Sequence, residues 1–458
     1  MTRRWIGASL TAAMARTLVV AAALGLAGAA SAQPARDMHD DVPIAQGLKR
    51  ERSLPAGAIP LQPLIDAVAD GDVLELKAGV YAAPATISRP MTLKGAPGAI
   101  IDGGGVGSLL TVKADKTTIS NLVFRNSGDR HEELDAGIRL RGQFNIVKDN
   151  IFENCLFGLD LQQAHNNILR RNRISSQAVE QGVRGDAIRI WYSNDVRVED
   201  NEVTDSRDSA IWYSHGVKMV RNSFVGGRYG VHLMYAHKNV VNENRFAANT
   251  VGVFLMYSND NEVKDNDIRY SQGPSGIGIG FKESSGARIL HNDIFANAQG
   301  LYMDASPYDP EPEAKNIFEN NRIAYNGVAL LMHSDWEGNV FSANDFVGNH
   351  STVMVNGGGS AKRNLWEGNY FDDYQGFDRN RDGVGDTPHE IWSWVDRLWA
   401  DVKDAQFFRA APSLELIDLV ERMASLVEPQ LLLRDKAARI NPVATGARRP
   451  NKLEALRQ

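Results

Sequence analysis

The stretches Gly230-Val-His-Leu-Met-Tyr235 and Gly252-Val-Phe-Leu-Met-Tyr257 are consecutive copies of one short repeat. After each glycine an apolar residue stands at every second position, which is the alternation of a β-strand with one buried face. Related stretches recur every 21 to 29 residues between residues 121 and 369, and none of them shows the spacing of an amphipathic helix. A repeat of this length built from strands predicts a β-solenoid.

Two apolar columns and one Asn column run through these repeats. The apolar columns predict strands that face one continuous core, with neighbouring coils about 4.8 Å apart. The Asn column fits a turn, because Asn tolerates the left-handed conformation and stacked amides can hydrogen-bond from coil to coil. We therefore interpret these Asn residues as scaffold and expect an all-β, right-handed parallel β-helix over residues 61–370. The Asn column comprises Asn121, Asn150, Asn172, Asn201, Asn222, Asn244, Asn266, Asn292, Asn321, Asn344 and Asn369. The first apolar column comprises Ile138, Leu159, Ile188, Ile211, Val231, Val253, Ile279, Leu301, Val328 and Val353. The second comprises Leu140, Leu161, Ile190, Tyr213, Leu233, Leu255, Phe281, Met303, Leu330 and Val355.

Residues 1–32 have the pattern of a signal peptide. They carry Arg3, Arg4 and Arg16 without an acidic residue, then an apolar run, and they end in Ala30-Ser-Ala32. We expect export by the Sec rather than the twin-arginine route and a mature chain that begins near Gln33. No later stretch is long and apolar enough to span a membrane, so we expect a periplasmic protein that reaches the membrane only through partners.

The net charge disfavours nucleic-acid binding, and the cysteine content excludes cysteine-based sites. The formal net charge is −6, and it becomes −9 when the three leader arginines are removed, which argues against nucleic acid as a partner. Cys155 is the single cysteine, so a disulfide framework and a Cys-based metal site within one chain are both excluded.

The remaining segments differ in character from the repeats. Residues 33–60 form an N-terminal segment, and a short helix starting at Leu61 should cap the first coil. Residues 371–390 are an Asp/Gly-rich loop, and residues 391–430 contain two stretches of helical character, 391–408 and 413–428. Residues 431–458 are basic and poor in apolar residues, which predicts a mobile tail.

Two surfaces are candidates for partner binding. Around Trp212 and Phe254 the outward positions are apolar where a solvated face should be charged, and such patches mark binding sites. Coverage of this patch by the C-terminal helices explains the same pattern, and both readings stay open. The C-terminal helices themselves carry more apolar residues than a cap requires, so we expect them to dock a partner through Trp394, Trp399, Leu416, Leu419 and Met423. A helical cap packed on the last coil is the alternative, and the two roles can coexist.

Met234 and Met256 occupy one outward column on adjacent coils, with His232 and His237 nearby. Thioether sulfur together with imidazole is a soft ligand set that suits Cu(I), so these four residues are the candidate copper ligands. Exposed Met also serves as adaptable contact surface. Met332 and His333, some coils further on, repeat the combination.

Residues 378–386 resemble the first part of a calcium-binding loop. Asp378, Asn380, Asp382 and Asp386 supply oxygen at loop positions 1, 3, 5 and 9. The twelfth position is His389 where a bidentate Glu is expected. A Ca²⁺ site and an Asp/Asn/Gly turn without metal are equally good interpretations.

An enzymatic function is an alternative, because many right-handed parallel β-helices, the pectate-lyase-like solenoids, cleave or epimerise acidic polysaccharides. Such chemistry needs a cluster of carboxylates and a base on one outward face. The nearest candidate is Asp160 between Arg139 and Arg189, with Asp186 adjacent, and alternating charges on successive rungs also form structural ion pairs. Sugar binding through Trp191, Trp212 and Tyr302 is a further alternative. We expect a protein that is not an enzyme and name no catalytic residue.

Several motifs together resemble the NosD family of nitrous-oxide-reductase maturation proteins. They are the two stretches that open this section, the closing Gly368-Asn-Tyr-Phe-Asp-Asp-Tyr374, the Asp378 to Asp386 loop, and the segment from Pro412 to Pro429. Phe371 stands where family members commonly have Trp. The resemblance implies a periplasmic β-helix that associates with an ABC transporter permease and its ATPase, and we expect the C-terminal helices to dock this transporter. It also implies a part in copper delivery from a lipoprotein chaperone to nitrous oxide reductase.

Overall fold

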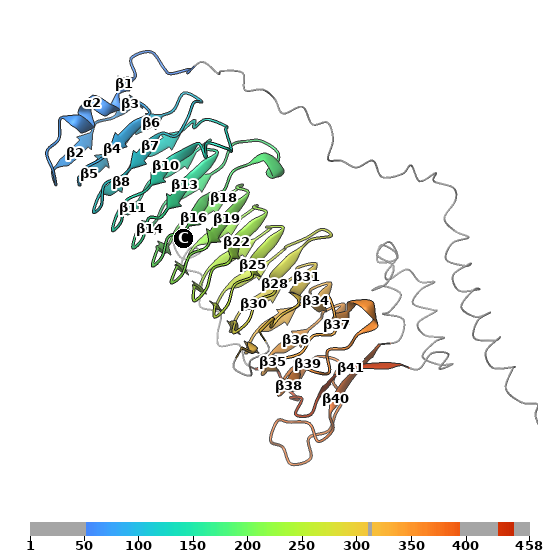
Figure 1. Ribbon diagram of the computed structural model, residues 1–458. Helices are drawn as coiled ribbons and strands as arrows, with labels where there is room; N and C mark the ends of the chain where they lie inside the picture. Colours follow the sequence, from blue (N-terminus) through green and yellow to red (C-terminus); the bar gives the residue numbers. More distant parts are fainter. Residues whose placement is uncertain (1–51, 310–313, 394–428, 444–458) are drawn as a thin grey trace, which may run out of the picture. The chain divides into compact units, whose positions relative to one another are not determined.

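The computed structural model describes residues 52–309, 314–393 and 429–443. Within these residues the chain coils as a parallel β-helix, so the expected fold class is confirmed (Figure 1). Three parallel sheets of 14, 12 and 13 strands form its faces, and one two-stranded antiparallel pair follows. Each coil contributes one strand to each sheet in turn. The expected signal peptide, residues 1–32, and most of the segment 33–60 lie outside the described residues.

The strands are short because three turns must close each coil. The 14-stranded sheet comprises β1 (Ile59–Pro60), β3 (Gly79–Ala82), β6 (Ala99–Asp102), β9 (Val123–Arg125), β12 (Ile151–Glu153), β15 (Arg173–Ser175), β18 (Glu202–Thr204), β21 (Ser223–Val225), β24 (Arg245–Ala247), β27 (Asp267–Arg269), β30 (Asp293–Phe295), β33 (Arg322–Ala324), β36 (Asp345–Val347) and β39 (Tyr370–Phe371). The 13-stranded sheet comprises β2 (Val73–Leu76), β5 (Thr92–Gly95), β8 (Thr118–Ser120), β11 (Ile146–Lys148), β14 (Ile168–Arg170), β17 (Arg197–Glu199), β20 (Lys218–Val220), β23 (Val240–Asn242), β26 (Glu262–Lys264), β29 (Arg288–Leu290), β32 (Asn316–Glu319), β35 (Asn339–Ser342) and β38 (Leu365–Glu367).

The 12-stranded sheet carries the candidate site. It comprises β4 (Ala85–Ile87), β7 (Leu110–Val112), β10 (Ala136–Leu140), β13 (Phe157–Gln162), β16 (Ile188–Trp191), β19 (Asp208–Trp212), β22 (Tyr229–Met234), β25 (Val251–Met256), β28 (Ile277–Lys282), β31 (Gln299–Asp304), β34 (Val328–Met332) and β37 (Ser351–Val355). Two 3₁₀ turns, η1 (Gln181–Val183) and η2 (Asn356–Gly358), lie in its connections.

The apolar columns face the core as expected, with two exceptions. Ile138, Leu159 and Leu233 are fully buried, and aromatic residues of the other sheets stack above one another in the same core, as Phe224 and Phe246 do at 5.2 Å between ring centroids. Burial of this apolar surface is the main favourable contribution to folding.

Our column assignment is wrong by two positions at β19 and at β34. Ile211 is paired with Ile190 and Leu233, so it belongs to the second column, and Tyr213 lies in the following turn. Likewise Leu330 is paired with Leu301, and the second core position is Met332. The coils differ in length, and the register shifts between β19 and β22. Counting positions from the small residue that opens each strand therefore assigns the wrong residues to the core columns in these two strands.

The Asn column is a buried hydrogen-bond ladder along the helix axis. Asn222 shows the pattern: its side-chain amide donates to the Val198 carbonyl at 2.8 Å and to Asn244 Oδ1 at 3.0 Å. Its own Oδ1 accepts both the side-chain and the backbone N–H of Asn201, each at 2.9 Å. Each Asn therefore satisfies turn groups that would otherwise be buried without partners.

The left-handed residue of each turn is the one before the ladder Asn, contrary to our expectation. Arg171 and Arg221 have positive φ values of 52° and 54°, whereas the Asn that follows each does not. Asn121 is also a left-handed residue, with φ 58°, and the ladder position of its coil is held by Leu122, whose N–H donates to Asn150 Oδ1. The ladder thus begins at Asn150 and not at Asn121.

Both ends of the coil stack are closed, the first of them as expected. Helix α2 (Leu61–Asp66) buries Leu61 and Ile65 on the first coil. At the other end, residues 391–393 belong to strand β40 (His389–Ser393) and not to a helix, and the expected mobile tail contains strand β41 (Gln430–Asp435), which pairs with β40. The prediction of a mobile tail from its polar composition was wrong here, because a tertiary contact orders this segment. The buried Asp435 carboxylate accepts the side-chain N–H of Asn369 at 2.8 Å.

Replacing Asn222 by Ala should lower the free energy of unfolding by about 2–4 kcal/mol, because the change leaves two N–H groups of Asn201 without their acceptor and removes the side-chain donor to the Val198 carbonyl. Asn244 Oδ1 keeps the backbone N–H of residue 222 as a donor. Urea denaturation followed by circular dichroism measures the loss. Asn441→Ala, at an exposed Asn, is the control and should change stability little. An Asn222→Ala protein as stable as the control would show that the ladder is not a principal source of stability.

Candidate functional site

The two methionines of the predicted copper site face each other on the 12-stranded sheet. Met234 at the end of β22 is the direct partner of Met256 at the end of β25. Both side chains are half-buried and lie in one outward column between Trp212 and Lys282. Directly paired residues of adjacent strands are about 4.8 Å apart, so the two thioethers can reach one ion.

Trp212 sits in a different column from the one that we expected. Its strand partners are Trp191 and Met234, so it belongs with the methionines, while Ala210 occupies the position beside His232. The register shift at β19 causes the difference. The shift brings the Trp212 indole into the column of the methionine pair, and the ring still meets the His232 imidazole edge-on.

His232 is a buried imidazole with no hydrogen-bond partner. It is 7% exposed, and neither ring nitrogen bonds to any group within the described residues. Tyr229 stacks on it with ring centroids 4.7 Å apart, and Trp212 and Phe254 meet it edge-on at 6.2 Å. Burial lowers the pKa of His232 to about 4, with Asp208 acting in the opposite direction and Arg228 in the same one. The imidazole is therefore neutral at pH 7, and an unsatisfied buried nitrogen is costly unless a ligand uses it.

The apolar patch around Phe254 is closed by its own side chains. Phe254 is 7% exposed and packs in a small cluster with Val251 and Ile277. Gly280 makes this packing fit, because a Cβ there would lie 2.4 Å from the Phe254 ring. Phe254 therefore packs beneath the site, whereas we expected it to be an exposed contact residue. Trp212 is half-exposed.

Two buried carboxylates on the same face form ion pairs. The fully buried Asp160 carboxylate is bound by Arg141 at 2.8 Å and Arg189 at 2.9 Å. Asp186 pairs with Arg207 at 2.9 Å, and burial raises its pKa to about 6 against the effect of that arginine. Each carboxylate is engaged by guanidinium groups, which is the pattern of the structural ion pairs weighed above.

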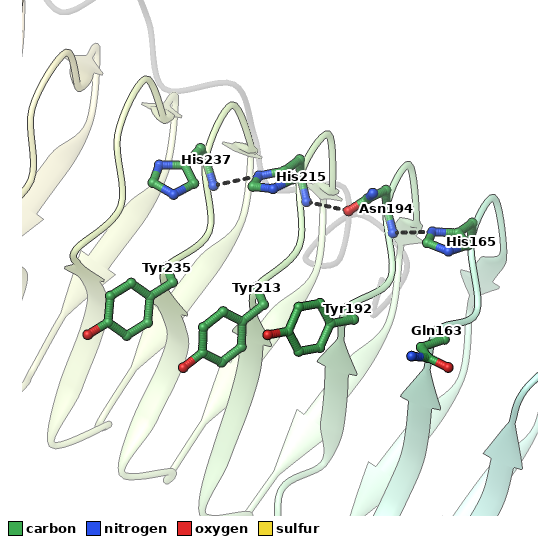
Figure 2. Close-up of a pocket in the computed structure, with 8 residues that line it drawn as sticks. All are labelled: Gln163, His165, Tyr192, Asn194, Tyr213, His215, Tyr235 and His237. Carbon is green, nitrogen blue, oxygen red and sulfur yellow. Dashed lines mark hydrogen bonds between the residues drawn. The ribbon is translucent and has the colours of Figure 1, made fainter.

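His237, the fourth predicted copper ligand, lies in the turn after β22 and lines a groove (Figure 2). Its Nδ1 accepts the backbone N–H of Asn259 at 3.0 Å. Burial and the neighbouring His215 lower its pKa. The groove holds about 660 Å³ and is lined by Gln163, His165, Tyr192, Asn194, Tyr213, His215, Tyr235 and His237.

We did not predict this groove from the sequence, although the sequence contains a pattern that marks it. Tyr213-Ser-His215 and Tyr235-Ala-His237 repeat one pattern, and Tyr192-Ser-Asn194 varies it. The pattern falls between the strands, where an alternation search does not look.

The predicted calcium loop is held by hydrogen bonds of its own. The Asp378 carboxylate accepts the backbone N–H groups of Arg381 at 2.6 Å and of Gly383 at 2.9 Å. Asp382 accepts the N–H of Val384 at 2.8 Å, and Asp386 that of Arg379 at 2.8 Å. These bonds account for the turn without an ion, and Ca²⁺ binding by Asp378, Asn380, Asp382 and Asp386 stays a prediction.

Among the described residues, no three His, Cys, Asp or Glu side chains come together in a way that could hold a metal ion. Met332 is fully buried in the core, and so is Cys155, whose pKa burial raises to about 12. Trp394, Trp399, Leu416, Leu419 and Met423 lie outside the described residues. In the part of the chain that is described, no helix has the length and apolar character needed to cross a membrane.

Comparisons with known protein sequences agree on one family. A family model described as "Periplasmic copper-binding protein (NosD)" matches residues 175–376. A Pseudomonas aeruginosa protein named "Probable ABC transporter binding protein NosD" is 30% identical over 396 residues, 83% of this chain and 90% of that protein. The protein of the same name from Stutzerimonas stutzeri is 28% identical over 387 residues, 81% of this chain and 86% of that protein. Among solved structures, the A-module of the Azotobacter vinelandii mannuronan C-5 epimerase AlgE6 has a TM-score of 0.52 at 15% identity, covering 70% of this chain and 98% of the module. A likeness at that identity shows the fold alone.

The lowered pKa of His232 predicts a pH dependence of stability. A histidine whose pKa falls from 6.5 to about 4 on folding contributes stability that is present above pH 6.5 and lost as the pH falls toward 4. Replacing His232 by Phe, the residue at the same column position on β25, removes this dependence. The difference in free energy of unfolding between the parent and His232→Phe should therefore change by up to about 3 kcal/mol between pH 6.5 and pH 4. A difference that stays constant in urea titrations over this range would contradict a buried, neutral His232.

Proposed function

Because this chain belongs to the NosD family, we propose that it is a periplasmic accessory protein that binds copper in transit to nitrous oxide reductase and docks on an ABC transporter. The copper is cargo in this proposal, received from a lipoprotein chaperone and passed on. The family description supports copper binding in the periplasm, and the names of both relatives support a transporter partner. Maturation of nitrous oxide reductase rests on the motifs that this chain shares with the family.

The observation that carries the proposal is the unpartnered His232 beside the paired Met234 and Met256. Two thioethers and one neutral imidazole are soft donors that favour Cu(I) over the harder divalent ions. His232 and Met234 point outward from the same strand two residues apart, a separation of roughly 6.6 Å, which flexible methionine side chains can bridge. Because the pKa of His232 is about 4, protons do not compete with the metal at neutral pH.

The surroundings suit an ion that must come and go. Trp212 and Phe254 flank the imidazole and limit access of water, and such an apolar shell stabilises the lower charge of Cu(I). The two methionines are half-exposed, so a partner's ligands can reach the ion from outside. His237 is less well placed, because its Nδ1 is already occupied by a backbone N–H.

We also propose a binding role and not catalysis. A general base on this face would need a carboxylate that is free to take a proton. Asp160 and Asp186 are instead held by Arg141, Arg189 and Arg207. The likeness to an epimerase module concerns the fold alone and carries no argument for polysaccharide chemistry.

Replacing both Met234 and Met256 by Leu should weaken Cu(I) binding by at least about 100-fold, because two of the three soft ligands are lost while the side-chain volume is kept. The measurement is an anaerobic competition titration with a Cu(I) chelator. Met332→Leu, at a methionine buried in the core, is the matched control and should bind as the parent does. Parent-like binding by the double variant would show that the copper site lies elsewhere.

We place the proposed transporter contact at the C-terminal apolar residues. Point substitutions test this contact better than a truncation, because residues further along the chain belong to the fold. A truncation before residue 413 would also remove β41 and Asp435, which closes the Asn ladder. Replacing Leu416, Leu419 and Met423 by Ser leaves both in place. We expect this triple variant to keep its thermal unfolding midpoint and its Cu(I) affinity but to lose co-purification with the permease. Retained co-purification would move the contact to another surface.

A further inference from the structure

The groove in the turns after β13, β16, β19 and β22 is a second site, distinct from the methionine column. Figure 2 shows two rows of side chains along it: one of Tyr192, Tyr213 and Tyr235, the other of His165, Asn194, His215 and His237. Both rows advance by one residue per coil, so their spacing is that of the scaffold. Tyr213 and Tyr235, for example, have ring centroids 5.2 Å apart, and His215 and His237 5.3 Å.

The histidines of the groove are fixed as hydrogen-bond donors. Nδ1 of His165 accepts the backbone N–H of Asn194 at 3.1 Å, and Nδ1 of His215 accepts that of His237 at 3.3 Å. His237 follows the same rule with Asn259. A neutral imidazole that accepts at Nδ1 carries its proton at Nε2. Each ring therefore offers an Nε2–H to a ligand, and metal binding at Nε2 would require the proton to move to Nδ1 and break the turn.

The tyrosines offer hydroxyl groups and ring edges, but not ring faces. Tyr192, Tyr213, Tyr235 and Tyr257 form one continuous stack with centroid distances of 4.9, 5.2 and 4.9 Å. Trp191 meets one end of the stack edge-on at 4.7 Å, and the Lys282 ammonium lies 5.9 Å from the ring at the other end. Sugar rings bind aromatic residues by lying on their faces, and here those faces are covered.

The tyrosines are also held in an unusual backbone conformation. Tyr192, Tyr213 and Tyr235 have positive φ values of 46°, 51° and 48°, which bulky residues rarely adopt and which costs of order 1–3 kcal/mol at each position. The same turn position holds Gln163 and Ala305 in other coils, so the turn itself does not require Tyr. A run of aromatic residues at strained positions points to a role in binding.

The groove carries no formal charge. None of its eight lining residues is Asp, Glu, Lys or Arg. A strip of N–H and O–H donors without charge suits a neutral ligand with a row of acceptors, because a carboxylate would give up its hydration without meeting a cation. Backbone carbonyls of a polypeptide in polyproline II conformation are such a row, since that helix makes no internal hydrogen bonds.

We propose that this groove binds a proline-rich segment of a protein partner, with Nε2–H of His165, His215 and His237 and the Tyr hydroxyl groups donating to its backbone carbonyls. Grooves that bind polyproline II segments recur in proteins, because the ordering entropy of such a helix is low. Here the contacts are the N–H and O–H groups and the ring edges, since the ring faces are covered. The inference goes beyond copper binding. It also places the segment at the edge of the proposed copper site, since Tyr235 directly follows Met234 and Tyr257 directly follows Met256.

Fluorescein-labelled decaproline is the probe, because it has a carbonyl at every residue and no backbone N–H along its length. Fluorescence anisotropy with the mature protein should show binding that changes less than about twofold between roughly 50 and 500 mM salt. Tyr213→Phe keeps the ring stack and removes one hydroxyl group, so it should weaken binding about five- to tenfold. Tyr270→Phe, at an exposed Tyr with positive φ outside the groove, is the control and should leave binding unchanged.

His215→Asn tests the second row without disturbing the turn. Asn194 occupies the same position one coil earlier, and its Oδ1 accepts the His215 N–H at 2.9 Å. The Asn variant can therefore make the backbone bond. Its own N–H donors at Nδ2 lie closer to the backbone than Nε2–H of His and do not reach as far into the groove. It should fold normally and bind decaproline about five- to tenfold more weakly. The Cu(I) affinity of His215→Asn should equal that of the parent, and the Met234→Leu, Met256→Leu protein should bind decaproline normally. The two variants therefore test peptide binding and copper binding separately.

Three outcomes would overturn the inference. Tighter, salt-sensitive binding of decaglutamate would show that the groove selects anions. Binding of a mannuronate hexasaccharide, lost in Tyr213→Phe, in the absence of decaproline binding would show a carbohydrate site. Decaproline binding that survives both Tyr213→Phe and His215→Asn would place the peptide elsewhere on the protein.

Discussion

The buried Asn ladder is the constraint on which the other features of this protein depend. A coil of 21 to 29 residues must turn three times, and each turn leaves backbone groups that the strands do not pair. Asn222 and its equivalents satisfy these groups and bond to the next coil at the same time. One hydrogen-bond pattern therefore closes the turns and fixes the register between neighbouring coils, and Asp435 ends it where no further Asn follows.

The register between neighbouring coils brings residues of successive repeats together into a site. Met234 lies opposite Met256 because the coils stack without slipping, and Trp212 joins them because the register does shift at β19. The same stacking aligns the tyrosines and histidines of the groove. Two strips of different chemistry thus run side by side, one with soft sulfur and nitrogen donors and one with N–H and O–H groups, and they meet at the end of each strand.

Neither strip relies on charge. His232 is neutral because it is buried, the groove has no charged lining residue, and the buried carboxylates of Asp160 and Asp186 are held by arginines. In a chain with a net charge of −6, long-range attraction would favour cations without selecting among them. Recognition through ligand softness and hydrogen-bond direction is selective where charge is not.

The sequence by itself determined the β-helix, the apolar core columns, the Asn scaffold and the pairing of Met234 with Met256, because each depends on a local period that survives from coil to coil. The tertiary structure alone decided which residues of β19 and β34 face the core, how deeply His232 and Phe254 are buried, and that the tail forms strand β41. These features depend on coil lengths and on contacts between residues far apart in the chain, such as Asp435 with Asn369. The groove has the same origin, because left-handed turn residues become a continuous surface only when successive coils lie in register.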